Sequence, residues 1–532
     1  MTVKGTVAIP MTDSTASANL SKGAFRTLAV ILLVGLTLRS AIFAGYIGID
    51  DITYISDAYR LAEGRWEATT YFGTARLGMT GTLAILFSLF GPSLAAVVVQ
   101  PLFWSVLAIP LAYATGKLVF KDVRVALLAA FCVAVYPLDV IYATQYFPDV
   151  AAATLMWVAF LCFYLAERER HGAWHFAAGV ATGVAYLHKE TALFVLLPLV
   201  LFFLYQRRWR PGYVWLGVGF AVVLLGEMLA FGLLFSDPLY RFHALVPIGT
   251  SVEPVSRADH DQIRPGGLLF SPLVALVTNH EYGLFYPVIA WAILSLVRRK
   301  DAASVPILLF FLTVAAYTLY GPTSIKVYRH LRPLERYTLP LTVPGMLILS
   351  RWMWLCLRPK WRWVISGILV SSWLGCICLD NSCTFRSTGQ SLEQFQTSHP
   401  GKTFVLHPHA YMSLFVARGL EPPSMVAILE WRTESGYCRR IDPFVPVYSD
   451  ELLLCDCFVA VPSDRQSPVL SSWKEIARCT RGRRWYVGPL EARGGILASL
   501  ANKLSPKMGY VIYYAPPANP GSPQAPSGLV KR

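Results

Sequence analysis

The sequence predicts a polytopic α-helical membrane protein, with about 11 transmembrane helices and a small C-terminal α/β domain. Three observations lead to this prediction. Hydrophobic residues make up 55% of the 532 residues and charged residues only 15%, whereas an average soluble domain has about 25% charged residues. Apolar runs occupy most of positions 24 to 379. From position 380 onward, mixed charges, proline and glycine replace them.

Transmembrane helices are predicted wherever an apolar run approaches the length of a crossing. A helix that spans the hydrocarbon core needs about 20 mostly apolar residues. The runs that approach or reach this length are 24–46, 93–116, 125–143, 150–166, 173–188, 191–206, 213–235, 283–297, 304–321, 337–350 and 363–379. We therefore expect a membrane domain over 24–379, preceded by a cytoplasmic tail at 1–23. The first run is long enough to stay in the membrane as an anchor, so no secretory signal is expected.

Basic residues set the predicted orientation of the chain. The 47 Lys and Arg residues against 32 Asp and Glu residues give a net charge of +15. In a soluble protein this would suggest nucleic-acid binding, but the cytoplasmic loops of a membrane protein are expected to be basic, so no nucleic-acid partner is predicted. Every second connection is basic: Lys117/Lys121/Arg124, Arg168/Arg170, Arg207/Arg208/Arg210, Arg298/Arg299/Lys300 and Arg358/Lys360/Arg362. These loops are predicted to lie on the cytoplasmic side of the cell (inner) membrane.

The remaining connections face the other side and contain acidic residues. They contain Asp50, Asp51, Asp57 and Glu63 in the first, Asp149 in the second and His188-Lys189-Glu190 in the third. Translocated loops that simply lack Lys and Arg would explain the sign of these loops. They would not explain two adjacent acids at the mouth of the first helix. We therefore expect the chemistry of the protein on the extracytoplasmic side.

The first outer connection, about 47 to 92, is too long to be a simple turn. Apolar residues after Asp51 recur at roughly helical spacing up to Glu63, which predicts a helix lying in the membrane interface. A second apolar piece, Leu77 to Phe90, is short for a crossing. We interpret it as re-entrant or interfacial, because a full crossing would place the next loops on the wrong side for their charge.

The sequence of the C-terminal region predicts an α/β domain over 380–515. A disordered tail that is rich in Pro, Gly and Ser is expected after it, at 516–532. Strands are expected at 403–406, 458–462 and 509–514, with a helix at 410–419. An odd number of crossings places this domain outside the cytoplasm. Its five cysteines (Cys383, Cys438, Cys455, Cys457 and Cys479) suit an oxidising compartment and a disulfide of open connectivity. Cys455-Asp-Cys457 lacks a second pair of metal ligands.

Asp50 and Asp51 are the leading catalytic candidates. An Asp before a helix commonly caps it, which contributes about 1 kcal/mol, but one Asp is enough for a cap. The other carboxylate, beside a like charge and close to lipid, should have a raised pKa, which would make it a competent base near neutral pH.

Further charged residues are expected on the same face as this pair. They are Asp149, which by itself reads as a helix cap, and the cations Arg76, Lys189 and Arg336. Acids and cations around one cavity at lipid depth suit a substrate with an anionic head and an apolar tail. Arg39 and Glu227 fall inside predicted crossings, where charges are costly. Either they pair with each other or face a lipid groove, or Arg39 extends to the interface.

Four short motifs together resemble the C-type (GT-C) integral-membrane glycosyltransferases. They are Asp50-Asp51, Tyr146-Phe-Pro-Asp149, Gly183 to Lys189, and Glu335-Arg-Tyr-Thr-Leu-Pro340. Their order is similar to that of the protein O-mannosyltransferase and aminoarabinose transferase (ArnT-like) group. The resemblance implies a GT-C-like membrane domain and transfer of a sugar, with inversion, from a polyprenyl-phosphate donor to a hydroxyl acceptor outside the cytoplasm. The acceptor is a lipid, a glycan or a protein.

The resemblance also implies roles for the candidate residues. Asp50 or Asp51 would be the general base and Asp149 would orient the acceptor or the base. The donor phosphate would be bound by Arg76, His188, Lys189, Arg336 and Tyr337. A divalent cation that bridges Asp50 or Asp51 to the phosphate remains an open alternative, with no metal ligand assigned.

Two other classes of function compete with this one. A transporter or flippase of lipid-linked or anionic substrates would also have many crossings and an outer acidic site, but such proteins often show internal repeats, which this sequence lacks. An inert scaffold or sensor would use the outer domain to bind a partner. In that case replacing Asp50 and Asp51 would leave function intact.

Overall fold

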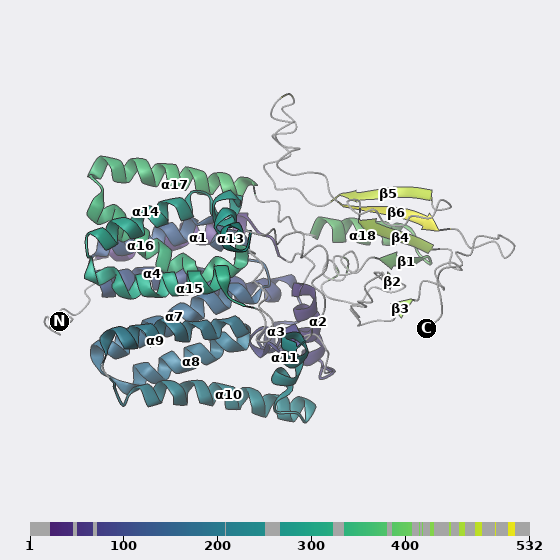
Figure 1. Cartoon of the computed structure of the whole chain (residues 1–532). Coiled ribbons are helices and arrows are strands. Elements are labelled where there is room, and N and C mark those ends of the chain that lie inside the picture. Colours follow the sequence, from purple (N-terminus) through teal and green to yellow (C-terminus); the bar gives the residue numbers. More distant parts are fainter. Residues whose placement is uncertain are drawn as a thin grey trace. The chain divides into compact units, whose positions relative to one another are not determined.

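The computed structural model describes residues 22–45, 50–67, 72–207, 209–250, 267–322, 335–379 and 386–406, and beyond them mainly the strands of a sheet. The chain divides into two compact units (Figure 1). The first comprises residues 1–43, 63–83 and 98–380, and the second comprises residues 44–62, 84–97 and 381–532.

The first unit is a bundle of helices. Its elements are α1 (Lys22–Ala41), η1 (Phe72–Ala75), the first half of α3 (Leu77–Phe90), most of α4 (Leu94–Phe120), α5 (Val123–Val135), α6 (Pro137–Tyr142), α7 (Pro148–Glu169), α8 (Gly172–His188), η2 (Glu190–Val195), α9 (Leu196–Gln206), α10 (Tyr213–Phe235), α11 (Tyr240–Thr250), α13 (Gly267–Thr278), η3 (His280–Tyr282), α14 (Phe285–Arg298), η4 (Ala302–Ser304), α15 (Val305–Tyr320), η5 (Glu335–Leu341), α16 (Thr342–Cys356) and α17 (Pro359–Leu379).

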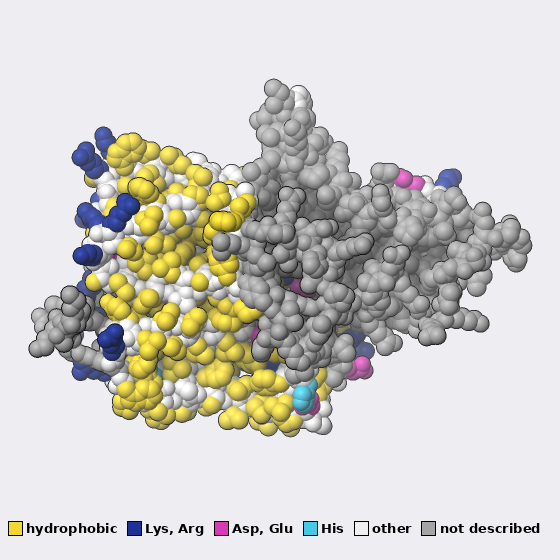
Figure 2. Space-filling view, viewed as in Figure 1, with side chains coloured by type: hydrophobic (Ala, Val, Ile, Leu, Met, Phe, Trp, Pro, Cys, Tyr) yellow, Lys and Arg dark blue, Asp and Glu magenta, His cyan; other side chains and the backbone are white. Residues whose placement is uncertain are grey.

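Each predicted crossing overlaps one or more helices of this bundle. Among the described residues, seven helices are long and apolar enough to cross a membrane, and α5, α9 with η2, and α14 are shorter apolar helices. The chain is therefore an integral membrane protein, as predicted. Figure 2 shows hydrophobic side chains over the visible face of the bundle, with Lys and Arg gathered at one end. The exposed basic residues lie in the connections that the sequence predicts to be cytoplasmic, and they include Lys121, Arg124, Arg168, Arg170, Arg207, Arg298, Arg299, Lys300, Arg358 and Lys360.

One predicted crossing is wrong in detail, because the run 125–143 is not a continuous helix. α5 ends at Val135, and α6 begins at Pro137. Between them Tyr136 is extended, with φ −71° and ψ 128°. The proline ring clashes with a helical conformation of the preceding residue, so the chain breaks there and restarts with proline in the first helical turn.

Arg39 is fully buried in α1. It does not extend to the interface, although the sequence had suggested that it would. Its guanidinium group donates hydrogen bonds to the Ser105 hydroxyl (2.7 Å) and to the carbonyl oxygens of Ala134 (2.9 Å) and Val133 (3.4 Å). These carbonyls belong to the last turn of α5, where no helical N–H is available to them. Arg39 therefore caps the broken end of α5 from a neighbouring helix.

Glycines allow α8 and α10 to pack at close range. A Cβ atom on Gly179 would overlap the carbonyl oxygen of Leu216, and one on Gly219 would overlap that of Phe176. Small residues at such contacts are typical of membrane helices, where close packing replaces the hydrophobic effect as the source of association. This contact holds the two helices that supply Tyr186 and Glu227 to the site described below.

The second unit contains α2 (Asp50–Ala62), α18 (Arg386–Ser398) and a six-stranded sheet. The strands are β1 (Thr403–Leu406), β2 (Val426–Leu429), β3 (Pro446–Val447), β4 (Cys457–Pro462), β5 (Lys474–Thr480) and β6 (Gly509–Ala515). Their order is β3-β2-β1-β4-β6-β5, with parallel pairs from β3 to β4 and antiparallel pairs of β6 with β4 and β5.

Three of these strands were predicted. β1, β4 and β6 match the expected strands at 403–406, 458–462 and 509–514, and α2 matches the helix expected after Asp51. Most of the helix expected at 410–419 lies outside the described residues, as do Cys383, Cys438 and Cys455. The domain boundaries at 380 and 515 and the disulfide stay predictions.

Candidate active site

Four charged or aromatic side chains meet in the first unit, at the ends of three helical elements. Asp149 lies in the first turn of α7, directly after Pro148 at its first position. Lys189 is an extended residue, with φ −155° and ψ 131°, between the end of α8 and the start of η2. Arg336 and Tyr337 belong to η5. These side chains all lie near helix ends, where the chain changes direction.

The cluster is built around the Asp149 carboxylate. The Lys189 ammonium group donates a hydrogen bond to Asp149 Oδ1, and Arg336 Nε lies 3.7 Å from Asp149 Oδ2. Each cation also faces an aromatic ring: Lys189 Nζ lies 3.9 Å from the centroid of the Tyr337 ring, and Arg336 Cζ lies 4.3 Å from that of Phe147. Asp149 and Lys189 are both buried, so their attraction is only weakly screened by water.

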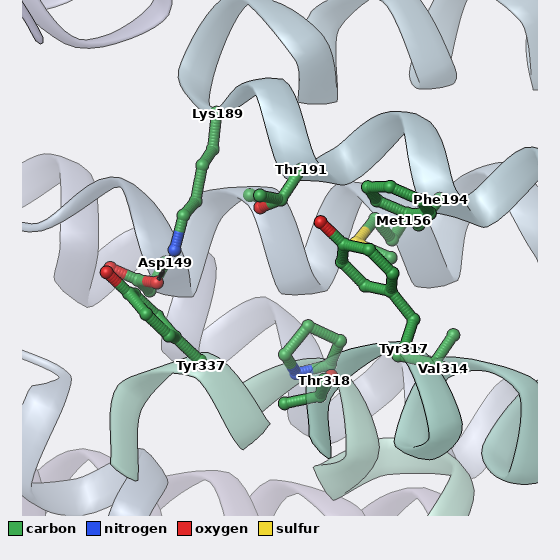
Figure 3. A pocket seen from close by; sticks show the side chains of 11 residues that line it. Asp149, Met156, Lys189, Thr191, Phe194, Val314, Tyr317, Thr318 and Tyr337 are labelled. Carbon is green, nitrogen blue, oxygen red and sulfur yellow. Dashed lines mark hydrogen bonds and ion pairs between the residues drawn. The ribbon is translucent and has the colours of Figure 1, made fainter. Parts of the chain in front are cut away.

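A pocket opens beside this cluster and contains about 450 Å³ of empty space, part of which is open to the surroundings. Figure 3 shows Lys189 reaching toward Asp149 and Tyr337 at one end, and Met156, Phe194 and Tyr317 gathered at the other. The remaining lining residues are Ala152, Thr191, Val314, Thr318 and Pro340. The pocket therefore joins a charged end to a largely apolar interior, as a ligand with an anionic head and an apolar tail requires.

A second set of charges forms a chain of ion pairs, Glu227–Arg241–Glu190–Arg76, which we name the ion chain. Arg241 Nη1 lies 2.6 Å from Glu227 Oε1, and Arg241 Nη2 lies 2.8 Å from Glu190 Oε1. Arg76 Nη2 lies 2.9 Å from Glu190 Oε2. The intramembrane Glu227 is therefore paired with Arg241 of α11, and not with Arg39.

His188 is held in a third network. Its Nδ1 lies 2.9 Å from the Val184 carbonyl oxygen, and its Nε2 lies 3.0 Å from Gln100 Nε2. Nδ1 must therefore donate to the carbonyl, which leaves Nε2 to accept from the amide. Gln100 in turn donates to the Gly78 carbonyl oxygen (2.9 Å). In this structure His188 connects α8 to α3 and α4, and its predicted role at the phosphate stays a prediction.

The structure thus brings Asp149, Lys189, Arg336 and Tyr337 together, while Arg76 and His188 have other partners. Sequence reasoning missed Arg241 and the role of Glu190 as a bridge between two arginines. Arg241 lies in α11, in a stretch of sequence outside every predicted crossing and motif. A signal was nevertheless present, since a carboxylate such as Glu227 inside an apolar helix requires a cation nearby.

Asp50 and Asp51 begin α2 in the second unit, where Asp51 is fully buried. Carboxylates in the first turn of a helix are stabilised by the helix dipole. In the same helix, burial raises the pKa of the Asp57 carboxyl to about 7, against an opposing effect of Arg60. Within the described ranges, no group of three or more His, Cys, Asp or Glu side chains lies together in a way that could hold a metal ion.

The helical bundle of this integral membrane protein therefore holds a buried, charged pocket. Residues 80–230 match the family model described as dolichyl-phosphate-mannose-protein mannosyltransferase. The comparison with curated proteins finds no match for this sequence.

Two solved structures are similar to this chain in fold. ArnT from Cupriavidus metallidurans in the apo state is similar, with a TM-score of 0.54 and 14% identity, over 94% of this chain and 99% of that chain. ArnT bound to undecaprenyl phosphate gives a TM-score of 0.53 and 14% identity, over 92% and 98%. The oligosaccharyltransferase AglB from Archaeoglobus fulgidus, in complex with an inhibitory peptide and a dolichol-phosphate, gives 0.47 and 13%, over 76% and 64%. The predicted resemblance to the ArnT-like and O-mannosyltransferase group of GT-C proteins is confirmed.

Proposed function

We propose that this protein transfers a sugar from a polyprenyl-phosphate donor to a hydroxyl acceptor on the extracytoplasmic side of the membrane, with inversion. The observation that carries the proposal is the pocket that joins the Lys189–Asp149–Arg336 cluster to a largely apolar interior. A polyprenyl phosphate has the matching chemistry, with an anionic head and an isoprenoid chain. The similarity to the ArnT structure bound to undecaprenyl phosphate supports the same class of donor.

The cations of the cluster suit the leaving group of this reaction. When the anomeric carbon–oxygen bond breaks, the prenyl phosphate departs as a stable anion and needs no general acid. It needs positive charge, because neutralising the developing negative charge lowers the barrier. We assign this role to Lys189 and Arg336, which approach Asp149 from two different elements. Tyr337 supports Lys189 through a cation–π contact of 3.9 Å.

Asp149 is better suited to positioning than to proton transfer. Its carboxylate accepts a hydrogen bond from Lys189 and also faces Arg336. Both oxygens of this carboxylate face a cation, Oδ1 facing Lys189 and Oδ2 facing Arg336. We therefore propose that Asp149 orients the two cations and that the base comes from elsewhere.

Asp50 or Asp51 is our proposed base. The acceptor hydroxyl would lose its proton to one of these carboxylates while its oxygen attacks the anomeric carbon from the face opposite to the phosphate. General-base catalysis contributes typically about 10²–10⁴-fold to a rate. Loss of the correct carboxylate should therefore nearly abolish turnover while leaving the protein folded.

The test is a transfer assay in membranes with a panel of radiolabelled polyprenyl-phosphate sugars. The native chain is compared with Asp50→Asn and Asp51→Asn. We expect one of the two variants to lose at least 10²-fold in rate, and the labelled product of the native chain identifies the acceptor. Equal transfer by all three proteins would overturn the assignment of the base.

Asp122→Asn is the matched control. Asp122 caps α5, accepting a hydrogen bond of 2.8 Å from the Arg124 amide, in a connection on the predicted cytoplasmic side. Asn caps helices as well as Asp does, so this variant should keep the native stability and rate.

A further inference from the structure

Glu190 is the central residue of the ion chain, because its carboxylate bridges two arginines. Glu190 Oε1 lies 2.8 Å from Arg241 Nη2, and Glu190 Oε2 lies 2.9 Å from Arg76 Nη2. Arg76 Nε also donates to this carboxylate, at 3.2 and 3.3 Å. Two guanidinium groups are therefore held by one carboxylate.

The burial of Arg241 explains why two carboxylates of the ion chain contact it. The Arg241 side chain is only 1% exposed, and Glu227 is 2% exposed. An isolated buried charge is costly unless it is paired and hydrogen-bonded. Arg241 meets this requirement with Glu227, Glu190, the Tyr186 carbonyl oxygen at 2.6 Å and the Tyr186 ring at 3.9 Å. The ion chain contains two positive and two negative groups.

The ion chain lies next to the Lys189–Asp149–Arg336 cluster, because Glu190 follows Lys189 in the sequence. Lys189 is extended, so the two consecutive side chains separate: Lys189 binds Asp149, and Glu190 binds Arg76 and Arg241. Consecutive Cα atoms lie only about 3.8 Å apart. The charge of Glu190 therefore acts on any anion that Lys189 binds.

We propose that Glu190 sets the affinity of the pocket for phosphate. By holding Arg76 and Arg241 in ion pairs, it offsets their positive charge and limits how tightly Lys189 and Arg336 retain an anion. Turnover requires such a limit, because the prenyl phosphate that remains after sugar transfer must leave before the next donor binds. Glu190 acts through its neighbours and is a positioning residue. This inference rests on the proposed function.

The proposal predicts an unusual sign for Glu190→Gln. This variant keeps the shape of the side chain and removes one negative charge, so an anion at Lys189 should bind more tightly. Removing a unit charge at short range, at an effective dielectric constant of about 20, changes affinity on the order of tenfold. If Glu190 served stability alone, its loss would disorder the cluster and weaken binding.

The experiment measures the affinity of the purified full chain in lipid nanodiscs for undecaprenyl phosphate, together with its melting temperature. We expect Glu190→Gln to bind on the order of tenfold more tightly and to turn over more slowly. The double variant Glu190→Gln/Arg76→Gln removes both partners of one ion pair, and its affinity should return toward the native value. Arg76→Gln alone should bind more weakly, which provides a second test if Glu190→Gln does not fold.

The matched control is Glu227→Gln, at the other end of the ion chain. It should lower the melting temperature with a much smaller change in affinity, because two charged groups separate it from Lys189. The inference would be overturned if Glu190→Gln bound undecaprenyl phosphate no more tightly than the native chain does. It would also be overturned if Arg76→Gln bound more tightly than the native chain. If the native chain itself does not bind undecaprenyl phosphate, the proposed function fails together with this inference. If the native chain binds undecaprenyl phosphate but the variants do not show the predicted changes in affinity, this inference alone is refuted.

Discussion

Lys189 donates a hydrogen bond to Asp149 from a position 40 residues further along the sequence. Each residue lies where a helix begins or ends, Asp149 in the first turn of α7 and Lys189 between α8 and η2. The pair is buried at the charged end of the pocket. Its placement links the packing of α7 against α8 to the geometry of the candidate site.

Lys189→Gln should therefore reduce sugar transfer strongly. The variant removes the charge that we propose for the leaving phosphate and leaves Asp149 with one cation fewer. Removing one such electrostatic contact typically costs about 10²–10³-fold in turnover. A transfer assay with a polyprenyl-phosphate sugar would measure this effect. Lys121→Gln, which removes an exposed lysine at the basic end of the bundle, is the control and should leave the rate unchanged. Native turnover by Lys189→Gln would contradict the assigned role.

Sequence reasoning identified most members of the site but not their partners. Asp149, Lys189 and Arg336 were predicted to lie on one face because alternating loop charges fixed the sides of the membrane. Pairing is a property of the folded bundle, so the sequence did not reveal that Glu190 binds both Arg76 and Arg241. The base assigned to Asp50 or Asp51 stays a prediction.

The same distinction holds for the fold. The crossings were predictable because each needs a long apolar run, which is a local property of the sequence. The break at Tyr136 had a local signal as well, in the proline that follows it. The burial of Arg39 had none, because its partners Ser105, Val133 and Ala134 come from other helices.

Gly179→Ala should destabilise the protein by about 1–3 kcal/mol, as overpacking of a tight contact does. The new methyl group would overlap the Leu216 carbonyl oxygen and push α10 away from α8. Gly226→Ala on α10 is the matched control, because nothing lies within 4 Å of the added atom and alanine favours a helix. Melting temperatures in one detergent would compare the two variants. Equal melting temperatures would refute the close α8–α10 contact.

Arg39→Met should also lower the melting temperature. The variant keeps much of the apolar volume but leaves the Val133 and Ala134 carbonyls without their donor. A buried polar group that loses its partner costs about 1–3 kcal/mol. Arg26→Met, at an exposed position of the same helix, should have little effect. A melting temperature of Arg39→Met equal to that of Arg26→Met would show that the cap on α5 is dispensable.

Lys300→Gly and Arg298→Gly should change stability in opposite directions, although each removes one exposed positive charge from the same connection. Lys300 has φ 55°, a left-handed conformation that costs residues other than glycine about 1–2 kcal/mol. Arg298 ends α14, where glycine costs up to about 1 kcal/mol. We expect a higher melting temperature for Lys300→Gly and a lower one for Arg298→Gly. A shift of both in the same direction would indicate that charge, and not backbone conformation, dominates there.

Asp57 should make the stability of the protein depend on pH. Burial raises the pKa of this carboxyl from 3.8 to about 7, so between these values the folded state keeps a proton that the unfolded state has lost. The contribution of Asp57 to stability should be greatest below about pH 4, fall as the pH rises to about 7, and then level off. A shift of about three pKa units corresponds to on the order of 4 kcal/mol.

Asp57→Asn removes this titration and should flatten the dependence of the melting temperature on pH between 4 and 7. Glu67→Gln, which changes an exposed acid beyond the end of the same helix, should keep the native slope. If the native protein and Asp57→Asn had the same slope, Asp57 would have to be ionised in the folded state near neutral pH. Its carboxylate would then need a charged or hydrogen-bonding partner strong enough to offset its burial.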